Sequence, residues 1–186
     1  MPITINGSGS ITGVNVGGLP DGIVDEDTLA AGTSFVSYAI LAHIEADGTD
    51  GGSSVIDTWT TRTINTEVAD PDSIVTLSSN QFTLGAGSYL IKWTCSSYLT
   101  SSANSRLYDV TNTTSIRNGI NAFTSTATNS ACNSPGSARV SPTGSTAYEI
   151  QMIVNTSNAG DGFGRSNAAT GSGEEVYLFV EIYKES

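Results

Sequence analysis

The only histidine of the chain, His43, is the first residue to consider as a catalytic group. Glu45 lies two positions later, so on an extended strand both side chains point to the same face. A nucleophile–histidine–acid site would also need an activated serine or cysteine, and the chain contains no G-x-S-x-G turn that could supply one. We therefore expect His43 to be a surface or subunit-interface residue, and we expect no catalytic residue and no enzyme.

Two acidic clusters carry oxygen atoms of the kind that calcium binds. One comprises Asp47, Asp50 and Asp57, and the other lies within residues 21–27. Neither cluster has the EF-hand spacing or the bidentate glutamate that makes that motif specific. Both are more typical of solvated loops, so the sequence predicts no metal ion and no cofactor.

The candidates for ligand contact lie in a glycine-rich loop at 160–173, GDGFGRSNAATGSG. Its glycine content is that of a phosphate-binding loop, but the GK[ST] signature and a following helix are missing. Loops of small polar residues with an occasional aromatic are typical of adhesive surfaces. We expect Phe163 to be exposed there, and Phe163 and Arg165 are the predicted receptor contacts. Trp59 and Trp93 are expected in core or trimer-axis packing rather than in a sugar-stacking platform.

These side chains must be positioned by short β-strands. Apolar and polar residues alternate with a period of two in four main segments, at 36–45, 88–99, 147–157 and 174–185. No window of helical length carries an i, i+3, i+4 apolar stripe. We predict an all-β fold, a jelly-roll β-sandwich of about eight to ten strands with a short N-terminal extension. The shared faces of these segments comprise Val36, Tyr38, Ile40, Ala42 and Ile44; Tyr148, Ile150, Met152 and Val154; and Val176, Leu178, Val180 and Ile182.

Four further apolar residues interrupt the polar faces of these strands, namely Leu41, Leu90, Ile153 and Phe179. In an isolated sandwich such side chains would be exposed to water, whereas in an oligomer they become contact residues. Charged residues make up only 13% of the chain, and the strands are rich in serine, threonine and asparagine. Strands of this kind fit subunits that pack around a threefold axis. We therefore predict a homotrimer.

Size and charge exclude several classes of partner. The 186 residues provide for one domain with a short extension, and the net charge of −11 disfavours binding to nucleic acid or to an anionic membrane. The chain shows no signal-peptide pattern and no apolar run long enough to span a bilayer, so we expect no membrane insertion and folding in the cytoplasm. There Cys95 and Cys132 would remain reduced, one in a strand and one in a loop. A disulfide between the two remains the alternative.

Residues 1–33 differ in composition from the rest of the chain. They are rich in glycine and acidic residues, and their apolar side chains are too few and too evenly spread to close a core of their own. We therefore expect the segment either to be disordered or to bury its apolar side chains against copies of itself. We place a domain boundary between an anchoring or trimerising segment at 1–33 and a head domain at 34–186. The candidate anchoring side chains are Ile3, Ile5, Ile11, Val14, Val16 and Leu19.

The opening string ITINGSGSITGVNVGGLPDGIVDEDTLA, at 3–30, resembles the start of many bacteriophage tail-fibre and fibre-like virion proteins. Three later strings resemble the head domain that often follows it: WTTRTINTEVADPDSIVTLSSNQFTLGAGSYLI at 59–91, RLYDVTNTTSIRNG at 106–119 and EEVYLFVEIYKE at 174–185. That head is similar to the trimeric jelly roll of the tumour-necrosis-factor and complement-head superfamily. The resemblance covers about half of the chain, in the expected order.

This resemblance implies a non-enzymatic structural protein of a tailed-phage virion, assembled in the host cytoplasm with other virion proteins as partners. One hypothesis is a short trimeric tail fibre or fibre tip that adheres to the host surface, with a glycan as the expected receptor and avidity from three weak sites. The alternative is a capsid decoration or head-fibre protein anchored to the shell by residues 1–33. A glycan-degrading enzyme is disfavoured, because the acidic residues give no carboxylate pair of suitable spacing.

Overall fold

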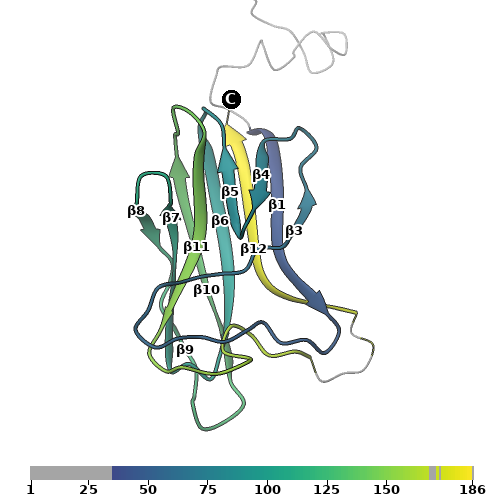
Figure 1. Cartoon of the computed structure of the whole chain (residues 1–186), viewed down its shortest axis with the longest axis vertical. Helices are drawn as coiled ribbons and strands as arrows, with labels where there is room; N and C mark the ends of the chain where they lie inside the picture. The colour runs from purple at the N-terminus through teal and green to yellow at the C-terminus, as the bar shows by residue number, and fades with distance from the viewer. Residues whose placement is uncertain (1–34, 168–170, 172, 186) are drawn as a thin grey trace, which may run out of the picture. The chain divides into compact units, whose positions relative to one another are not determined.

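The computed structural model describes residues 35–167, 171 and 173–185. They belong to the second of two units into which the chain divides, with the boundary after Thr33. Within the described residues there are twelve β-strands and no helix, and so no helix that could cross a membrane (Figure 1). The predicted anchoring side chains, from Ile3 to Leu19, lie outside this part of the chain, and their role stays a prediction.

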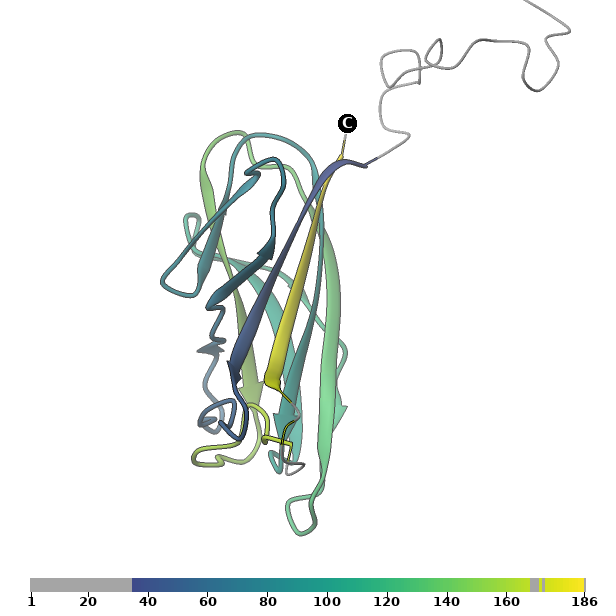
Figure 2. The ribbon, with the colours of Figure 1, turned by 90° about the vertical axis from the view of Figure 1, so that its right-hand side faces the viewer.

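The strands form two antiparallel sheets packed against each other (Figures 1 and 2). One has five strands in the order β10-β6-β12-β1-β3, and the other has seven, in the order β4-β5-β11-β7-β8 with β2 on β11 and β9 on β7. Most neighbours are distant in sequence, and β1 and β12 pair along almost their whole length. These crossovers are those of a jelly roll, so the predicted fold class is confirmed. The strands are β1 (Phe35–Ala46), β2 (Thr60–Thr61), β3 (Thr66–Ala69), β4 (Val75–Ser78), β5 (Gln81–Leu84), β6 (Tyr89–Tyr98), β7 (Ser102–Asp109), β8 (Thr114–Asn118), β9 (Ala122–Phe123), β10 (Ala131–Val140), β11 (Thr146–Val154) and β12 (Glu174–Glu185).

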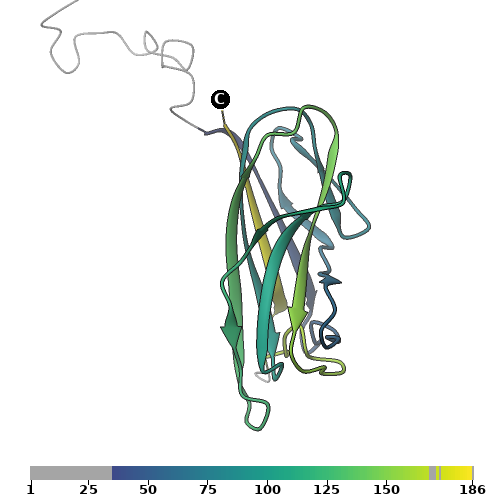
Figure 3. The same cartoon turned by 90° about the vertical axis from the view of Figure 1, so that its left-hand side faces the viewer.

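The connections between strands gather at the two ends of this unit. At one end β1 begins where β12 finishes, because Phe35 pairs with Glu185. At the other end the loops are tied together by backbone hydrogen bonds, such as those from the Gly51 N–H to the Gly164 carbonyl (2.8 Å) and from the Thr124 N–H to the Ser101 carbonyl (2.8 Å). We call this second end the loop end (Figures 1 and 3); its loops span residues 47–59, 99–101, 124–130 and 155–167.

The core lies between the two sheets and is built from alternate residues of the long strands. In β11 the predicted apolar face is the buried one, and in β12 three of its four members are buried. Each buried aliphatic or aromatic side chain of this kind contributes about 1.5–3 kcal/mol through removal of its surface from water. The buried members are Tyr148, Ile150, Met152 and Val154 in β11, and Leu178, Val180 and Ile182 in β12.

The inward face of β1 differs from the face that the alternation suggested. Ala39 and Leu41 are fully buried, whereas Tyr38 points outward and remains 44% exposed. The pairing with β12 decides this, since Leu41 lies opposite the buried Val180 and Tyr38 lies opposite Tyr183. Both faces of β1 are apolar, so a period of two cannot tell which face meets the second sheet. Leu41 is therefore a core residue and not a contact residue of an oligomer.

The Arg62 guanidinium is fully buried between the sheets and has no carboxylate partner among the described residues. It donates to the carbonyls of Ser96 (2.8 Å) and Phe163 (2.9 Å). It also donates to the carbonyl of Tyr177 (3.3 Å) and lies 4.2 Å from the centre of the Phe163 ring. Burial lowers the pKa of Arg62 to about 10, so the group stays charged at neutral pH.

Both thiols are free. Cys95 is buried in β6, where desolvation raises its pKa to about 11 and makes the thiolate scarce at neutral pH. Cys132 is half-buried, with its sulfur 3.1 Å from the Ser97 hydroxyl oxygen. It lies in β10, so the expectation that the second thiol sits in a loop is wrong.

Candidate functional site

The outer face of the five-stranded sheet carries large apolar side chains that no other described element covers. Phe179 is 44% exposed and lies between Ala42 of β1 and Thr94 of β6 in the register. Tyr38 lies on the same face, next to Tyr183. An exposed cluster of this kind is typical of a protein–protein contact. We call it the outer apolar face, and its members are Phe35, Tyr38, Ile40, Leu90, Val176, Phe179 and Tyr183.

A second, smaller apolar surface lies at the adjoining edge of the sandwich, where Ile120 is exposed among polar and charged residues. Ile120, between β8 and β9, is 66% exposed and lines a cavity of about 550 Å³ together with Arg117, Pro135 and Lys92. Lys92 also pairs with Glu181 (3.4 Å) on the five-stranded sheet, so the edge and the outer apolar face are continuous. Two different apolar surfaces on one molecule can form a heterologous contact, in which the face of one copy meets the edge of the next.

The two predicted receptor contacts differ in exposure. Arg165 is exposed at the loop end, where it donates to the Tyr98 hydroxyl (2.7 Å). Phe163 is only 6% exposed, so the expectation that its ring faces solvent is wrong. The neighbouring glycines suggested an open loop, but they let the backbone approach the core: a Cβ on Gly164 would lie 2.1 Å from a ring carbon of Tyr177. A contact between a receptor and Arg165 stays a prediction.

His43 is buried rather than exposed, which corrects the expectation of a surface residue. Its Nε2 atom lies 3.0 Å from a carboxylate oxygen of Glu45, and its ring packs 5.5 Å from that of Tyr177. Desolvation lowers the pKa of the imidazole, and the hydrogen bond with Glu45 opposes that shift. In the described part of the chain no serine or cysteine is hydrogen-bonded to the ring, and no cluster of three His, Cys, Asp or Glu side chains could hold a metal ion.

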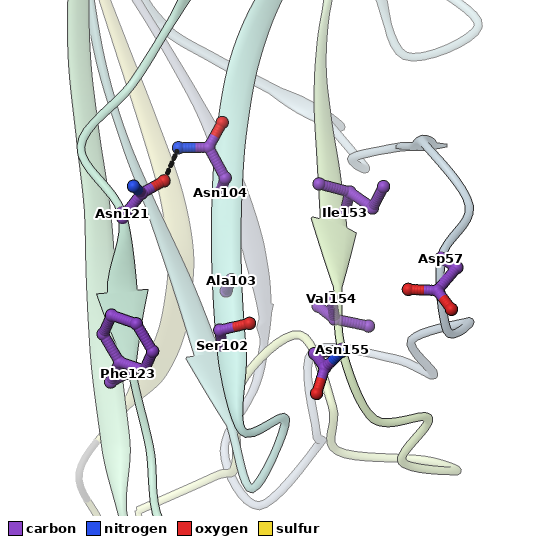
Figure 4. Close-up of a pocket in the computed structure, with 9 residues that line it drawn as sticks. All are labelled: Asp57, Ser102, Ala103, Asn104, Asn121, Phe123, Ile153, Val154 and Asn155. Carbon is purple, nitrogen blue, oxygen red and sulfur yellow. Dashed lines mark hydrogen bonds between the residues drawn. The ribbon is translucent and has the colours of Figure 1, made fainter.

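A pocket lined by both polar and apolar residues opens on the outer face of the seven-stranded sheet, near the loop end, and we call it the polar pocket for the asparagine, serine and aspartate side chains that it contains (Figure 4). Its volume is about 280 Å³, and β7, β9, β11 and the loop before β2 all contribute to it. At its centre the Asn104 side-chain amide donates to the Asn121 side-chain oxygen (2.7 Å) and to the Gly119 carbonyl (3.0 Å). Phe123 stands at one side and is 75% exposed. The lining residues are Asp57, Ser102, Ala103, Asn104, Asn121, Phe123, Ile153, Val154 and Asn155.

The turn at Asp57 closes this pocket on the side of β11. Its backbone N–H donates to the Val154 carbonyl (2.9 Å), and the preceding Ile56 N–H donates to the Ser157 hydroxyl (2.8 Å). Asp57 has a φ of 52°, a left-handed conformation that aspartate tolerates better than most residues do. No sequence pattern indicates this site, because its residues come from four separate segments. The one local signal was the polar outer face of β7, where Ser102 and Asn104 alternate with buried residues.

Comparison with known proteins identifies the fold. No protein-family model and no curated protein matches the chain. Among solved structures, PRD1 vertex protein P5 is 12% identical with a TM-score of 0.51, over 82% of this chain and 99% of that one. Eiger TNF from S. frugiperda is 11% identical with a TM-score of 0.51, over 82% and 94%. Murine APRIL is 8% identical with a TM-score of 0.50, over 80% and 98%.

The described head has the jelly-roll fold of these proteins. The predicted similarity to tumour-necrosis-factor heads is thereby confirmed at the level of the fold. Ile153, predicted as an oligomer contact, instead lines the polar pocket, whereas Phe179 and Leu90 lie on the outer apolar face.

Proposed function

We propose that the protein is a non-enzymatic structural protein of a phage virion and that its heads assemble as a homotrimer. The observation that carries this proposal is the outer apolar face. Tyr38 of β1 and Phe179 of β12 are exposed there, on the five-stranded sheet. A face-to-edge contact repeated around a threefold axis closes on itself and covers this face, along with Ile120 at the edge, in every copy. The likeness to tumour-necrosis-factor heads supports the same assembly.

The virion location rests on the N-terminal string at 3–30, which resembles the opening of fibre-like virion proteins. The likeness of the head to PRD1 vertex protein P5 supports it. The chain enters the head at the end opposite the loop end, because β1 begins there. In this proposal residues 1–33 attach the protein to the particle, and the loop end carries the host contact. We propose that the protein is a short tail fibre or fibre tip that adheres to the host surface.

A capsid decoration or head-fibre protein is the second candidate, favoured by the likeness to the vertex protein. The number of copies in a virion distinguishes the two candidates. Quantitative mass spectrometry of purified particles should find a dozen trimers or fewer for a tail fibre and many more for a shell protein. Absence of the protein from purified particles would contradict both.

The assembly itself is tested by the mass of the purified full chain. Sedimentation equilibrium at micromolar concentration should give three times the chain mass of 19.2 kDa, because a lone head leaves the outer apolar face in water. A stable monomer under these conditions would overturn the trimer.

A further inference from the structure

We propose that the polar pocket on the seven-stranded sheet binds a neutral sugar ring. The sugar site deepens the adhesive function proposed above and rests on it for its biological role. Three features of the pocket support this proposal. Some of its polar side chains have no hydrogen-bond partner among the described residues, it has an exposed aromatic ring, and its lining contains no cationic side chain.

Several polar groups in the pocket are open to a ligand. In the part of the chain that the structure describes, the Asp57 carboxylate, the Asn155 amide and the Ser102 hydroxyl form no side-chain hydrogen bond. Figure 4 shows the Asp57 carboxylate directed toward β11, with Asn155 below it. A carboxylate accepts hydrogen bonds from two neighbouring hydroxyls, and an amide both donates and accepts, so these groups match the alternating donors and acceptors of a sugar.

Phe123 supplies the apolar contact that a sugar ring needs. It lies on β9, directly opposite Ser102 of β7, and it is the most exposed of the large hydrophobic side chains in the described residues. Within the described residues the ring is 75% exposed, and the residue paired with it, Ser102, is polar. An exposed aromatic beside planar polar groups can cover the C–H face of a sugar while those groups bind its hydroxyls.

Charge and size narrow the class of sugar. The lining contains the carboxylate of Asp57 but no lysine, arginine or histidine, and the whole chain carries a net charge of −11. An anionic sugar would therefore enter a repulsive field. The volume of about 280 Å³ lies near the lower end of the range for small-molecule sites, about 300–1,000 Å³, and suits a sugar ring rather than a large ligand.

The pocket is organised before any ligand arrives. The left-handed turn at Asp57 is fixed by the hydrogen bond to the Val154 carbonyl, and Asn104 is fixed by its bonds to Asn121 and Gly119.

The test is a binding measurement on the full-length chain. Saturation-transfer NMR would use the methyl glycosides of glucose, galactose, mannose and N-acetylglucosamine as neutral probes, with glucuronate and galacturonate as charged comparators. We expect at least one neutral probe to bind and both uronates to fail. The variant Asp57→Asn keeps a side chain suited to a positive φ and should weaken binding about tenfold through loss of a charge-assisted hydrogen bond. Phe123→Ala should weaken it about three- to tenfold.

Two matched controls lie on β3 of the other sheet, where Glu67→Gln removes an exposed carboxylate and Val68→Ala shortens an exposed apolar side chain. Neither should change the affinity. The proposal is overturned if no neutral probe binds, if the uronates bind equally well, or if Asp57→Asn and Phe123→Ala bind like the controls. The molecular mass of each sample distinguishes failure of the sugar site from failure of the trimer. A trimer that binds no sugar refutes only the sugar site, and a monomer that binds sugar refutes only the trimer.

Discussion

At the residue scale, the buried guanidinium of Arg62 links parts of the chain that are far apart in sequence. It donates to carbonyls of β6, of β12 and of the loop that carries Phe163. The Phe163 and Tyr177 carbonyls also accept from the Ser96 hydroxyl (2.6 and 3.0 Å), so Arg62 and Ser96 together hold these three segments. A hydrogen bond from a charged donor of this kind contributes about 1.5–3 kcal/mol. The same contacts explain why Phe163 is in the core, because its ring stacks on the guanidinium.

Replacement of Arg62 by methionine should therefore destabilise the head. Methionine fills a similar volume but donates no hydrogen bond, and the Ser96 hydroxyl still serves two of the three carbonyls. We therefore expect the free energy of unfolding to fall by about 1–3 kcal/mol. Urea denaturation followed by circular dichroism measures this change. Arg139→Met is the matched control, because Arg139 is exposed and its ion pair with Glu185 should be worth less than about 1 kcal/mol. Equal stability of the two variants would contradict this role for Arg62.

At the element scale, the contact between β6 and β10 depends on a residue without a side chain. Gly136 lies opposite Trp93 in the register, and a Cβ at Gly136 would lie 2.1 Å from the indole ring. The indole is also fixed by its N–H, which donates to the Ser105 hydroxyl (2.8 Å) of the facing sheet. Nothing in the sequence around Gly136 indicates this contact, since Trp93 lies more than forty residues earlier.

Gly136→Ala should destabilise the sandwich, because the added methyl group cannot fit beside a ring that is held on both sides. Overpacking of this kind costs about 1–3 kcal/mol, and thermal unfolding measures it. Gly144→Ala is the control, because a Cβ there meets nothing within 4 Å. If Gly136→Ala has the same melting temperature as the wild type, the close contact with Trp93 does not constrain the fold.

At the scale of the whole molecule, the two sheets have outer faces of different character. The five-stranded sheet presents Tyr38 and Phe179, and the seven-stranded sheet presents the polar pocket around Asn104. This asymmetry suits an assembly in which the first face is covered and the second stays in solvent. The five-stranded sheet would then hold the copies together.

Phe179→Glu should dissociate the trimer without unfolding the head. Phe179 belongs to the outer apolar face and not to the core, so a charge there leaves the fold intact but must be desolvated on assembly. Analytical ultracentrifugation should show monomers with a β-type circular dichroism spectrum unchanged from the wild type. Val55→Glu, at the loop end, introduces the same charge at an exposed apolar residue and should remain trimeric. A trimer in both variants would place the interface elsewhere.

The sequence by itself determined the all-β class and most strand positions, because the alternation of side chains in β11 and β12 is a local property of the extended backbone. It also indicated more apolar strand surface than one core can bury. Only the tertiary structure decided which face of β1 is buried, that Phe163 lies under Arg62, and that Asp57 and Phe123 share a pocket. Each of these depends on contacts between residues tens of positions apart, and a local pattern carries no information about which distant strand will lie opposite it.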